Sequence, residues 1–400
     1  MIQNEKNSCI ICKKNISGKR LFTLFDMPAS AQDIPDQDAI DQEVGIELNL
    51  CQCDQCGLVQ FDCAPVDYYK DVIRSGGFST TMVELRRKQY TYLIEKYCLQ
   101  GKKFIEIGCG QGEFIKTLTE FDVDVYGIEH REQLVNQAKD MGLKVWRDFA
   151  ESKSTCLQNP YDVDKYDVFL SFNFLEHQPY PKEMLECIYE HLSDDGMGLI
   201  TVPSLEYILE HDGYYELIRD HLAYYTFNTL ECLLNSAGFE ILEKETINRD
   251  TISVIVRKSK KDNNIFEQVE VSEINIAGLK KSIGVINAEV EELLVELDNS
   301  NLSIAMWGAS HQGFTLAATT KLKDKVKYII DSAPFKQNKY APASHIPIVA
   351  LDYYFTNPVD WILIVAPGYT KEIADIIRER FGEHVKVLML QSKHIEEYVF

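Results

Sequence analysis

Short apolar runs alternate with longer amphipathic segments in two stretches of this 400-residue sequence. The first stretch begins at Phe104 and the second at Ser303. Runs of this length, separated by segments with helical spacing, are typical of parallel β-strands joined by crossover helices. The pattern therefore predicts an α/β protein that contains two Rossmann-like sheets of unequal length. The apolar runs are FIEIG, VDVYGIE, LKVWRD, YDVFLSF and GLITVP in the first stretch, and SIAMWG, VKYIID, WILIVA and VKVLML in the second.

The segments outside these stretches indicate three structural units, in keeping with a chain of this length. Residues 78–98 have apolar side chains three and four positions apart, which predicts a helix before the first sheet. Residues 258–270 are polar and predict a boundary, and 271–299 is predicted as a long helix rich in glutamate. We therefore expect an N-terminal unit, a central unit and a C-terminal unit, with the bounds 1–70, 71–262 and 263–400.

The charged residues exclude some classes of partner. The chain has 41 Lys and Arg against 62 Asp and Glu, a net charge of −21, and such a field repels a polyanion such as DNA or RNA. No apolar run approaches the ~18–20 residues of a membrane helix, and the start of the sequence, MIQNEKNSCIICKKNISGKR, lacks the apolar core of a signal peptide. We therefore expect a cytoplasmic protein that acts on a small molecule, with no nucleic-acid or membrane partner.

Two Cys-x-x-Cys pairs lie in the N-terminal segment, which is otherwise poor in core-forming residues. Each pair can supply one edge of a tetrahedral zinc site, and two pairs close a four-cysteine site of the structural kind. Gly57 follows the second pair, as the tight turn of such a pair prefers. The alternative is a set of unrelated buried thiols, because the gap between the pairs is longer than in compact zinc fingers. The predicted zinc ligands are Cys9, Cys12, Cys53 and Cys56.

The segment FIEIGCGQGEF, which begins at Phe104, is predicted as a strand, a glycine-rich turn and the start of a helix. The glycines let the backbone approach a ligand closely. Glu106 lies inside the strand, where its carboxylate can bind the amino end of a methionine moiety. Glu129 ends the next strand, where it can accept both hydroxyls of a ribose. These residues therefore predict a site for S-adenosylmethionine, in which the glycines of the turn are Gly108, Gly110 and Gly112.

The carboxyl ends of later strands supply further candidates, because parallel strands end at one edge of the sheet. Asp148 and Phe149 follow the third strand, where a side chain can meet the adenine amine. The alternative is a Rossmann domain for NAD, which Glu106 inside the first strand and the Leu175-Glu-His177 run disfavour. The remaining predicted cofactor contacts are Cys109, His130, Asn173, Phe174 and His177.

Residues 80–257 resemble the class I S-adenosylmethionine-dependent methyltransferases. The resemblance rests on the ExGxGxG start, the acid after the second strand and the D-V-x-x-S-x-x-x-x-E-H run that ends at His177. The whole chain resembles the three-domain sugar C-methyltransferases that act on dTDP-deoxysugars. That wider resemblance implies a zinc module, a methyl-donor domain and a second Rossmann-like domain that binds substrate. It rests on CDQCGLVQ from Cys53, WGASHQGFT from Trp307, IIDSAPFKQNKYAPASHIPI from Ile329 and APGYTKEI from Ala366.

The resemblance also implies catalytic residues. A Tyr-His-Glu-His segment supplies the base in that family, and the matching stretch here runs from Ile218 to His221. His221 matches the base, and Asp220 takes the place of the glutamate that would orient it. An imidazole, with an ordinary pKa of ~6.5, can take a proton from a carbon or a hydroxyl acceptor. The alternative is that His221 packs between the sheet and the next helix, since similar stretches occur in methyltransferases without a catalytic histidine.

The expected substrate is a nucleotide-linked sugar, methylated at carbon, oxygen or nitrogen. Arg86 stands where the family tends to have histidine, and residues 248–251 replace a His-Gly-Gly-Ser run, so the sugar and the methylated atom stay open. Two alternatives are a methyltransferase for a non-sugar metabolite and a non-catalytic scaffold, although the intact Glu106 and Glu129 disfavour the scaffold. The predicted substrate contacts are Ser75, Phe78 and Ser79 in a loop and Tyr224, with His311, Lys336 and His345 near a nucleotide diphosphate or else capping the second sheet.

Overall fold

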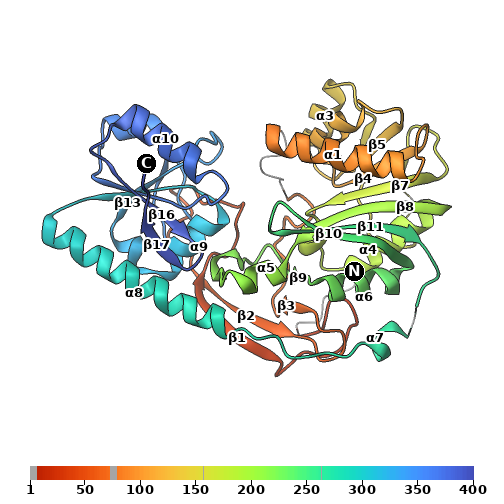
Figure 1. The fold of residues 1–400 in the computed structure, drawn as a ribbon, viewed down its shortest axis with the longest axis horizontal. Coiled ribbons are helices and arrows are strands. Elements are labelled where there is room, and N and C mark those ends of the chain that lie inside the picture. Colours follow the sequence, from red (N-terminus) through yellow and green to blue (C-terminus); the bar gives the residue numbers. More distant parts are fainter. Residues whose placement is uncertain (1–6, 73–78, 156, 263) are drawn as a thin grey trace.

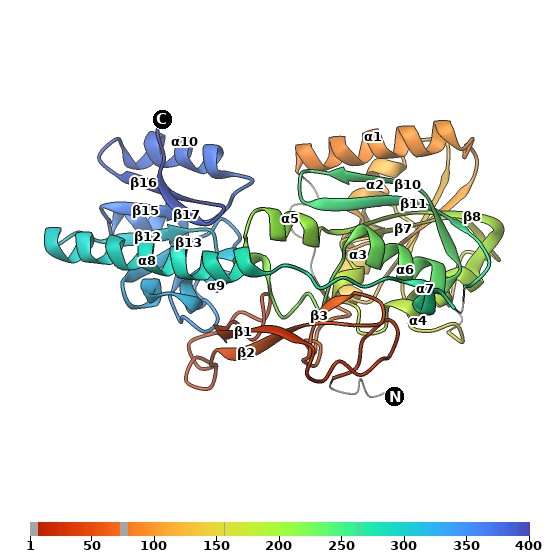
Figure 2. The same cartoon turned by 60° about the horizontal axis from the view of Figure 1, so that its bottom comes forward.

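The computed structural model describes residues 7–72, 79–155, 157–262 and 264–400. Two bodies, each with its own sheet, lie side by side, and a smaller sheet lies beneath the junction between them (Figure 1, Figure 2). We call them the central body, the C-terminal body and the N-terminal sheet. In the described part of the chain, no helix combines the length and the apolar character that crossing a bilayer requires.

The central body contains a seven-stranded sheet. Its strands are β4 (Lys103–Ile107), β5 (Asp124–Glu129), β6 (Val145–Arg147), β7 (Tyr166–Phe172), β8 (Leu192–Pro203), β10 (Phe239–Ile247) and β11 (Thr251–Lys258). They lie in the order β10-β11-β8-β7-β4-β5-β6. β11 is antiparallel to β8 and β10, and the other pairs are parallel. The carboxyl ends of β4, β5, β6, β7 and β8 therefore share one edge.

Helices cover both faces of this sheet. Phe104 belongs to the core under one set of helices and Ile105 to the core under the other, because successive strand residues point to opposite faces. The helix predicted at 78–98 is present as α1. The first face carries α1 (Thr80–Lys96), α2 (Glu113–Leu118) and α3 (Glu132–Asp140), and the second carries α4 (Pro181–His191) and α6 (Phe227–Ala237).

The N-terminal sheet is antiparallel and includes a strand from a distant part of the chain. Its strands are β1 (Arg20–Met27), β2 (Ile46–Gln52), β3 (Val59–Phe61) and β9 (Ala223–Tyr224), in the order β1-β2-β3-β9. Val59 pairs with Tyr224. The sequence predicts that the N-terminal unit ends at residue 70. The sheet nevertheless takes its last strand, β9, from far beyond that residue.

The C-terminal body is a second sheet with the strand order β14-β13-β12-β15-β16-β17. All neighbours are parallel except β16 and β17. The predicted glutamate-rich helix is present as α8, and the stretch before it holds only α7. The elements are α7 (Ile265–Gln268), α8 (Ala277–Ser300), β12 (Ile304–Trp307), α9 (His311–Thr319), η3 (Lys321–Asp324), β13 (Val326–Ile330), β14 (Ile348–Val349), η4 (Leu351–Phe355), β15 (Trp361–Ile364), α10 (Thr370–Phe381), β16 (Lys386–Gln391) and β17 (His394–Glu397).

One apolar core joins the N-terminal sheet to the C-terminal body. Leu48 of β2, Tyr214, Ile286 of α8 and Phe314 of α9 all belong to it and are almost completely buried. Tyr214 comes from the segment after β8 that forms α5 (Leu205–Glu210) and η2 (Tyr214–Glu216), and this segment lies between the two bodies (Figure 1). The shared core therefore fixes the C-terminal body beside the carboxyl edge of the central sheet.

Candidate active site

The glycine-rich turn after β4 depends on backbone conformations that favour glycine. Gly108, Gly110 and Gly112 have φ values of 69°, 58° and 85°, a region that side chains with a Cβ rarely adopt. A Cβ at Gly108 would also lie only 3.1 Å from the ring of Phe174. The turn therefore brings bare backbone close to the aromatic side chain that follows β7.

Glu129, at the end of β5, lies directly against this turn. Its side chain is buried, and Oε2 accepts a hydrogen bond from the Gly110 amide at 3.0 Å, while Oε1 accepts one from the Arg131 amide at 2.9 Å. Glu106, in the neighbouring strand β4, is completely buried. The structure therefore brings both predicted carboxylates to the turn, with Glu129 held in a fixed orientation by main-chain donors.

Three predicted aromatic contacts form a row beside the turn. The rings of His130 and Phe149 are 5.9 Å apart and nearly perpendicular, and the rings of Phe149 and Phe174 are 6.2 Å apart. Phe174 in turn covers Gly108. A planar adenine ring suits such an edge-to-face aromatic surface.

Two residues of the N-terminal segment also reach this row, although no motif marks them. The Lys70 Nζ lies 4.7 Å from the centre of the Phe149 ring. His130 Nδ1 lies 2.8 Å from Asp71 Oδ1. In the sequence, Lys70 and Asp71 are marked as candidates for this site by nothing more than their position shortly before the predicted substrate loop.

Asp148 and Asn173 are held by neighbours. The Asp148 carboxylate accepts hydrogen bonds from the amides of Phe149 and Gln158, at 2.8 and 2.7 Å, and from the Trp146 indole at 3.2 Å. Asn173 has a φ of 48°, and its Oδ1 accepts a hydrogen bond from the Thr201 hydroxyl. Both side chains therefore shape the loops at the carboxyl edge.

A pair of histidines lies at the same edge. His177 follows β7 in the short helix η1 (Leu175–His177), and its ring lies 4.8 Å from the ring of His221, which follows η2. His177 Nδ1 lies 2.8 Å from the carbonyl oxygen of Asp220, which can only accept a hydrogen bond. His177 Nε2 is therefore the nitrogen with a free lone pair.

Burial lowers the pKa of both imidazoles. For His177, desolvation is the largest cause of the lowered pKa. For His221, desolvation is also the largest cause, and the neighbouring His177 and His311 lower the pKa further, so that it falls well below 6.5. Both rings are therefore neutral at pH 7 and able to accept a proton.

Glu176 joins the two histidines in a group whose ligand atoms lie within 4.8 Å of one another. This spacing suits proton transfer or a divalent cation.

Asp220 does not occupy the place that the sequence predicts. Its carboxylate accepts hydrogen bonds from the Tyr68 hydroxyl at 2.5 Å and from the Ala31 amide at 2.9 Å. Within the described residues it makes no hydrogen bond to the His221 imidazole. Burial, and then the charge of Asp220, raise the pKa of Tyr68. Asp220 therefore ties the loop to the N-terminal segment and orients His177 through its main chain.

His311, a substrate candidate, lies near the histidine pair. It begins α9, and its ring lies 6.4 Å from that of His221. Its Nε2 lies 3.2 Å from Glu216 Oε2, and Gln312 donates to the other oxygen of Glu216 at 2.6 Å. The C-terminal body therefore places an imidazole at the edge of the central body.

Of the other substrate candidates, Tyr224 also lies beside His221, with the ring centres 6.2 Å apart, whereas Lys336 and His345 make their contacts elsewhere. Lys336 donates to the Ala309 carbonyl and lies 3.3 Å from Asp331, and His345 lies 2.8 Å from Glu43. The Tyr224 hydroxyl bonds to the main chain of Ile218 inside the core. Ser79 caps α1, and Ser75 and Phe78 lie outside the described residues.

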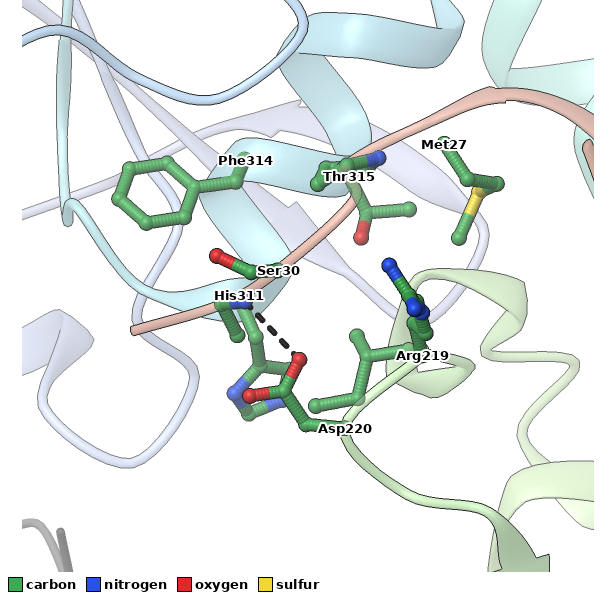
Figure 3. A pocket seen from close by; sticks show the side chains of 10 residues that line it. Met27, Ser30, Arg219, Asp220, His311, Phe314 and Thr315 are labelled. Carbon is green, nitrogen blue, oxygen red and sulfur yellow. Dashed lines mark hydrogen bonds between the residues drawn. The ribbon is translucent and has the colours of Figure 1, made fainter. Parts of the chain in front are cut away.

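A small cavity lies where the N-terminal segment, the loop at Asp220 and α9 meet (Figure 3). Its volume is about 10 Å³, which is room for roughly one water molecule. The polar side chains around it come from Ser30, Arg219, Asp220, His311 and Thr315. The Thr315 hydroxyl is buried and has no hydrogen-bond partner among the residues that the structure describes.

The four predicted zinc ligands converge. Their sulfur atoms all lie within 4.8 Å of one another, with Cys9 and Cys56 at 3.5 Å and Cys12 and Cys53 at 3.4 Å. Zn–S bonds of about 2.3 Å in a tetrahedron separate the sulfurs by about 3.8 Å, so the set fits a structural zinc ion. Gly57 has a φ of 75°, and its amide donates to the Cys53 carbonyl at 3.0 Å, which closes the turn.

Comparison with known proteins finds methyltransferases. Residues 82–244 match a methyltransferase domain and residues 242–389 match the C-terminal domain of C-methyltransferases. The C-methyltransferase NovU of Streptomyces niveus is 21% identical over 373 residues, which cover 88% of each chain. A putative methyltransferase of a Geobacillus strain is 30% identical over 122 residues, or 30% of this chain and 49% of the relative.

Solved methyltransferase structures also match part of the chain. Magnesium protoporphyrin IX methyltransferase from Synechocystis, with bound S-adenosylhomocysteine, matches with a TM-score of 0.37 and 15% identity over 48% of this chain and 97% of that one. In this chain, β11 is inserted antiparallel between β8 and β10, which is the strand arrangement of class I methyltransferases. The chain is an S-adenosylmethionine-dependent methyltransferase with a class I methyltransferase fold, and over most of its length it is similar to C-methyltransferases.

Proposed function

We propose that this enzyme methylates a carbon atom next to a keto group in a nucleotide-linked deoxysugar, with His221 as the general base. One observation carries the proposal: His177 and His221 lie 4.8 Å apart at the carboxyl edge of the central sheet, and α9 of the C-terminal body lies beside them. The match of residues 242–389 to the C-terminal domain of C-methyltransferases supports a carbon acceptor.

The cofactor site follows from the glycine turn. S-adenosylmethionine would supply an electrophilic methyl group there. Glu129, which the Gly110 and Arg131 amides already orient, would accept the ribose hydroxyls, and Glu106 would meet the amino group of the methionine part. Phe149 and Phe174 would flank the adenine. The histidine pair lies at the carboxyl edge of the sheet, which is where a donor bound at this turn would present its methyl group to an acceptor.

The base chemistry follows from the neutral imidazoles. His221 would take a proton from the carbon beside the keto group, and the electron pair left behind delocalises onto the keto oxygen as an enolate. That carbon would receive the methyl group that S-adenosylmethionine supplies, and S-adenosylhomocysteine would leave. His177, held by the Asp220 carbonyl, would stand beside His221 as a second polar contact for the acceptor.

The C-terminal body would hold the nucleotide part of the substrate. It is joined to the N-terminal sheet through the shared core, and methyltransferases that lack it still transfer methyl groups, so it serves something other than the cofactor. Binding energy from a remote nucleotide would fix the acceptor carbon at the methyl group. The four cysteines would hold a structural zinc ion, and the enzyme would act in the cytoplasm.

The test is a thermal-shift panel of dTDP-, UDP- and GDP-sugars, measured with and without S-adenosylhomocysteine. A ligand at about 100 times its Kd stabilises the folded protein by about 2.7 kcal/mol. We expect one dTDP-sugar to raise Tm more when S-adenosylhomocysteine is present. A panel in which no nucleotide sugar shifts Tm, while a non-sugar acceptor does, would overturn the proposal.

Replacing Glu129 with alanine tests the cofactor placement. Glu129→Ala removes the acceptor for the ribose hydroxyls, so we expect S-adenosylmethionine to bind more weakly by roughly 1.5–3 kcal/mol, the range for a hydrogen bond to a charged group. Calorimetry measures this directly. Glu132→Ala, on an exposed position three residues later, is the control and should bind normally. Equal affinity in both variants would contradict the ribose assignment.

A further inference from the structure

Methyl transfer to carbon releases one proton for each turnover. The sulfonium loses its positive charge, the acceptor exchanges a hydrogen for a methyl group, and the hydrogen must leave as a proton. If His221 takes that proton, as in the proposed function on which this inference rests, His221 must pass it to solvent before the next cycle. A second group near His221 is therefore needed for release.

The surroundings of His221 leave few routes. Within the described residues its imidazole makes no hydrogen bond, and it contacts the rings of His177, Tyr224 and His311. His177 and the neighbouring Glu176, whose ligand atoms lie within 4.8 Å of that of His221, are both buried, so a proton passed in this direction does not reach solvent. The Tyr224 hydroxyl bonds to the main chain of Ile218. His221 keeps a small exposed surface, but a bound acceptor would occupy it.

His311 is the remaining neighbour and reaches solvent. Its side chain is 35% exposed, and Glu216, which lies 3.2 Å from its Nε2, is 23% exposed. The ring centres of His221 and His311 are 6.4 Å apart, a distance that one bridging water molecule spans. The small cavity beside His311, whose lining includes Asp220, the residue before His221, has room for about one water molecule (Figure 3).

We propose that His311 relays the proton from His221 to solvent, with Glu216 as its orienting partner. The His221 imidazolium gives its proton to a bridging water, which passes one on to His311 Nδ1. His311 then releases the proton from Nε2 to Glu216 and to bulk water, and both imidazoles return to the neutral form. The C-terminal body thus contributes a positioning residue to the proton path of the central body.

The electrostatics agree with a relay in this direction. His311 lies in the positive field of His221 when that ring is protonated, and the Glu216 carboxylate lies on the opposite side of His311. A proton moving from His221 through His311 therefore approaches a negative charge and leaves a desolvated position. Gln312 holds the second oxygen of Glu216, so the carboxylate keeps its orientation through the cycle.

The test compares His311→Ala with the control His384→Ala, using as the acceptor the nucleotide sugar that shifts Tm in the panel above, in buffers of low and high imidazole concentration at constant pH and ionic strength. We expect His311→Ala to lower turnover by about a hundredfold, at the low end for one acid–base group, with unchanged KM. Added imidazole should restore turnover in this variant and leave the wild type and His384→Ala unaffected. A loss that imidazole does not restore means that His311 is structural.

A second measurement needs no acceptor. In protein labelled with ¹⁵N-histidine, the ring N–H of His221, assigned by its loss in His221→Asn, should exchange with solvent about tenfold more slowly in His311→Ala, in line with a lost acid–base contribution. Equal exchange in both proteins overturns the relay. An inactive His221→Asn together with a fully active, buffer-independent His311→Ala rejects the relay alone, whereas a fully active His221→Asn rejects the proposed base.

Discussion

Replacing His221 with asparagine should lower turnover by roughly 10²–10⁴-fold, the usual contribution of one acid–base group, and leave S-adenosylmethionine affinity unchanged. Asparagine keeps a polar side chain of similar size but cannot take the proton. The cofactor residues Glu106 and Glu129 belong to other strands, so calorimetry with S-adenosylmethionine should match the wild type. His384→Asn, on the far C-terminal body, is the matched control.

The pH dependence gives the same experiment a second readout. Burial, and then the charges of His177 and His311, lower the pKa of His221 well below 6.5. The ring is therefore neutral and competent above that range, and activity should be lost only as the pH falls through the lowered pKa. We expect the acid limb of kcat/KM to lie below pH 6.5 and to disappear in His221→Asn. A fully active variant would mean that His221 only packs.

Removing the zinc ion should have the largest effect on stability. A structural zinc contributes about 10–16 kcal/mol in zinc-finger peptides, which is comparable to or larger than the 5–15 kcal/mol that holds a typical domain folded. Cys53→Ser should therefore unfold the cysteine turns. Because β1 and β2 share a core with α8 and α9, the N-terminal sheet should loosen from the C-terminal body as well.

Elemental analysis and thermal melting check this expectation. We expect one zinc per chain in the wild type, loss of zinc and a lower Tm in Cys53→Ser, and no change in Cys98→Ser, which removes an exposed cysteine. A second metal ion per chain that is lost in His221→Asn would place it at Glu176, His177 and His221 and would make His221 a ligand instead of a base. A metal-free wild type with a normal Tm would contradict the zinc site.

Local patterns explain why much of the fold is predictable. The strands from Phe104 onward are short and strongly apolar because both faces of a parallel sheet are buried, and this signal needs no knowledge of the partner strands. Gly108, Gly110 and Gly112 mark their turn because their φ values exclude most other residues. The carboxylate at Glu129 could be placed since strand ends in a parallel sheet share an edge.

The rest of the site depends on contacts between distant segments. The pairing of β9 with β3 depends on packing between distant segments and leaves no local pattern in the sequence. The sequence therefore predicts that Tyr224 lines the substrate pocket, whereas in the structure its hydroxyl bonds to the main chain of Ile218 in the core. The Asp220 carboxylate faces Tyr68 and Ala31 because the N-terminal segment crosses this loop. Nothing in the spacing of His177, His221 and His311 indicates that their rings lie together.

The core shared by the N-terminal sheet and the C-terminal body also affects which parts of the chain can fold during translation. The core between α1, α2, α3 and the central sheet is built entirely from residues that precede α8, so the methyl-donor half can be completed on the ribosome. The apolar faces of β1 and β2 are translated long before α8 and α9, the helices that cover them. A nascent chain therefore carries an exposed hairpin through most of its synthesis, a state in which chaperone binding and aggregation compete with folding.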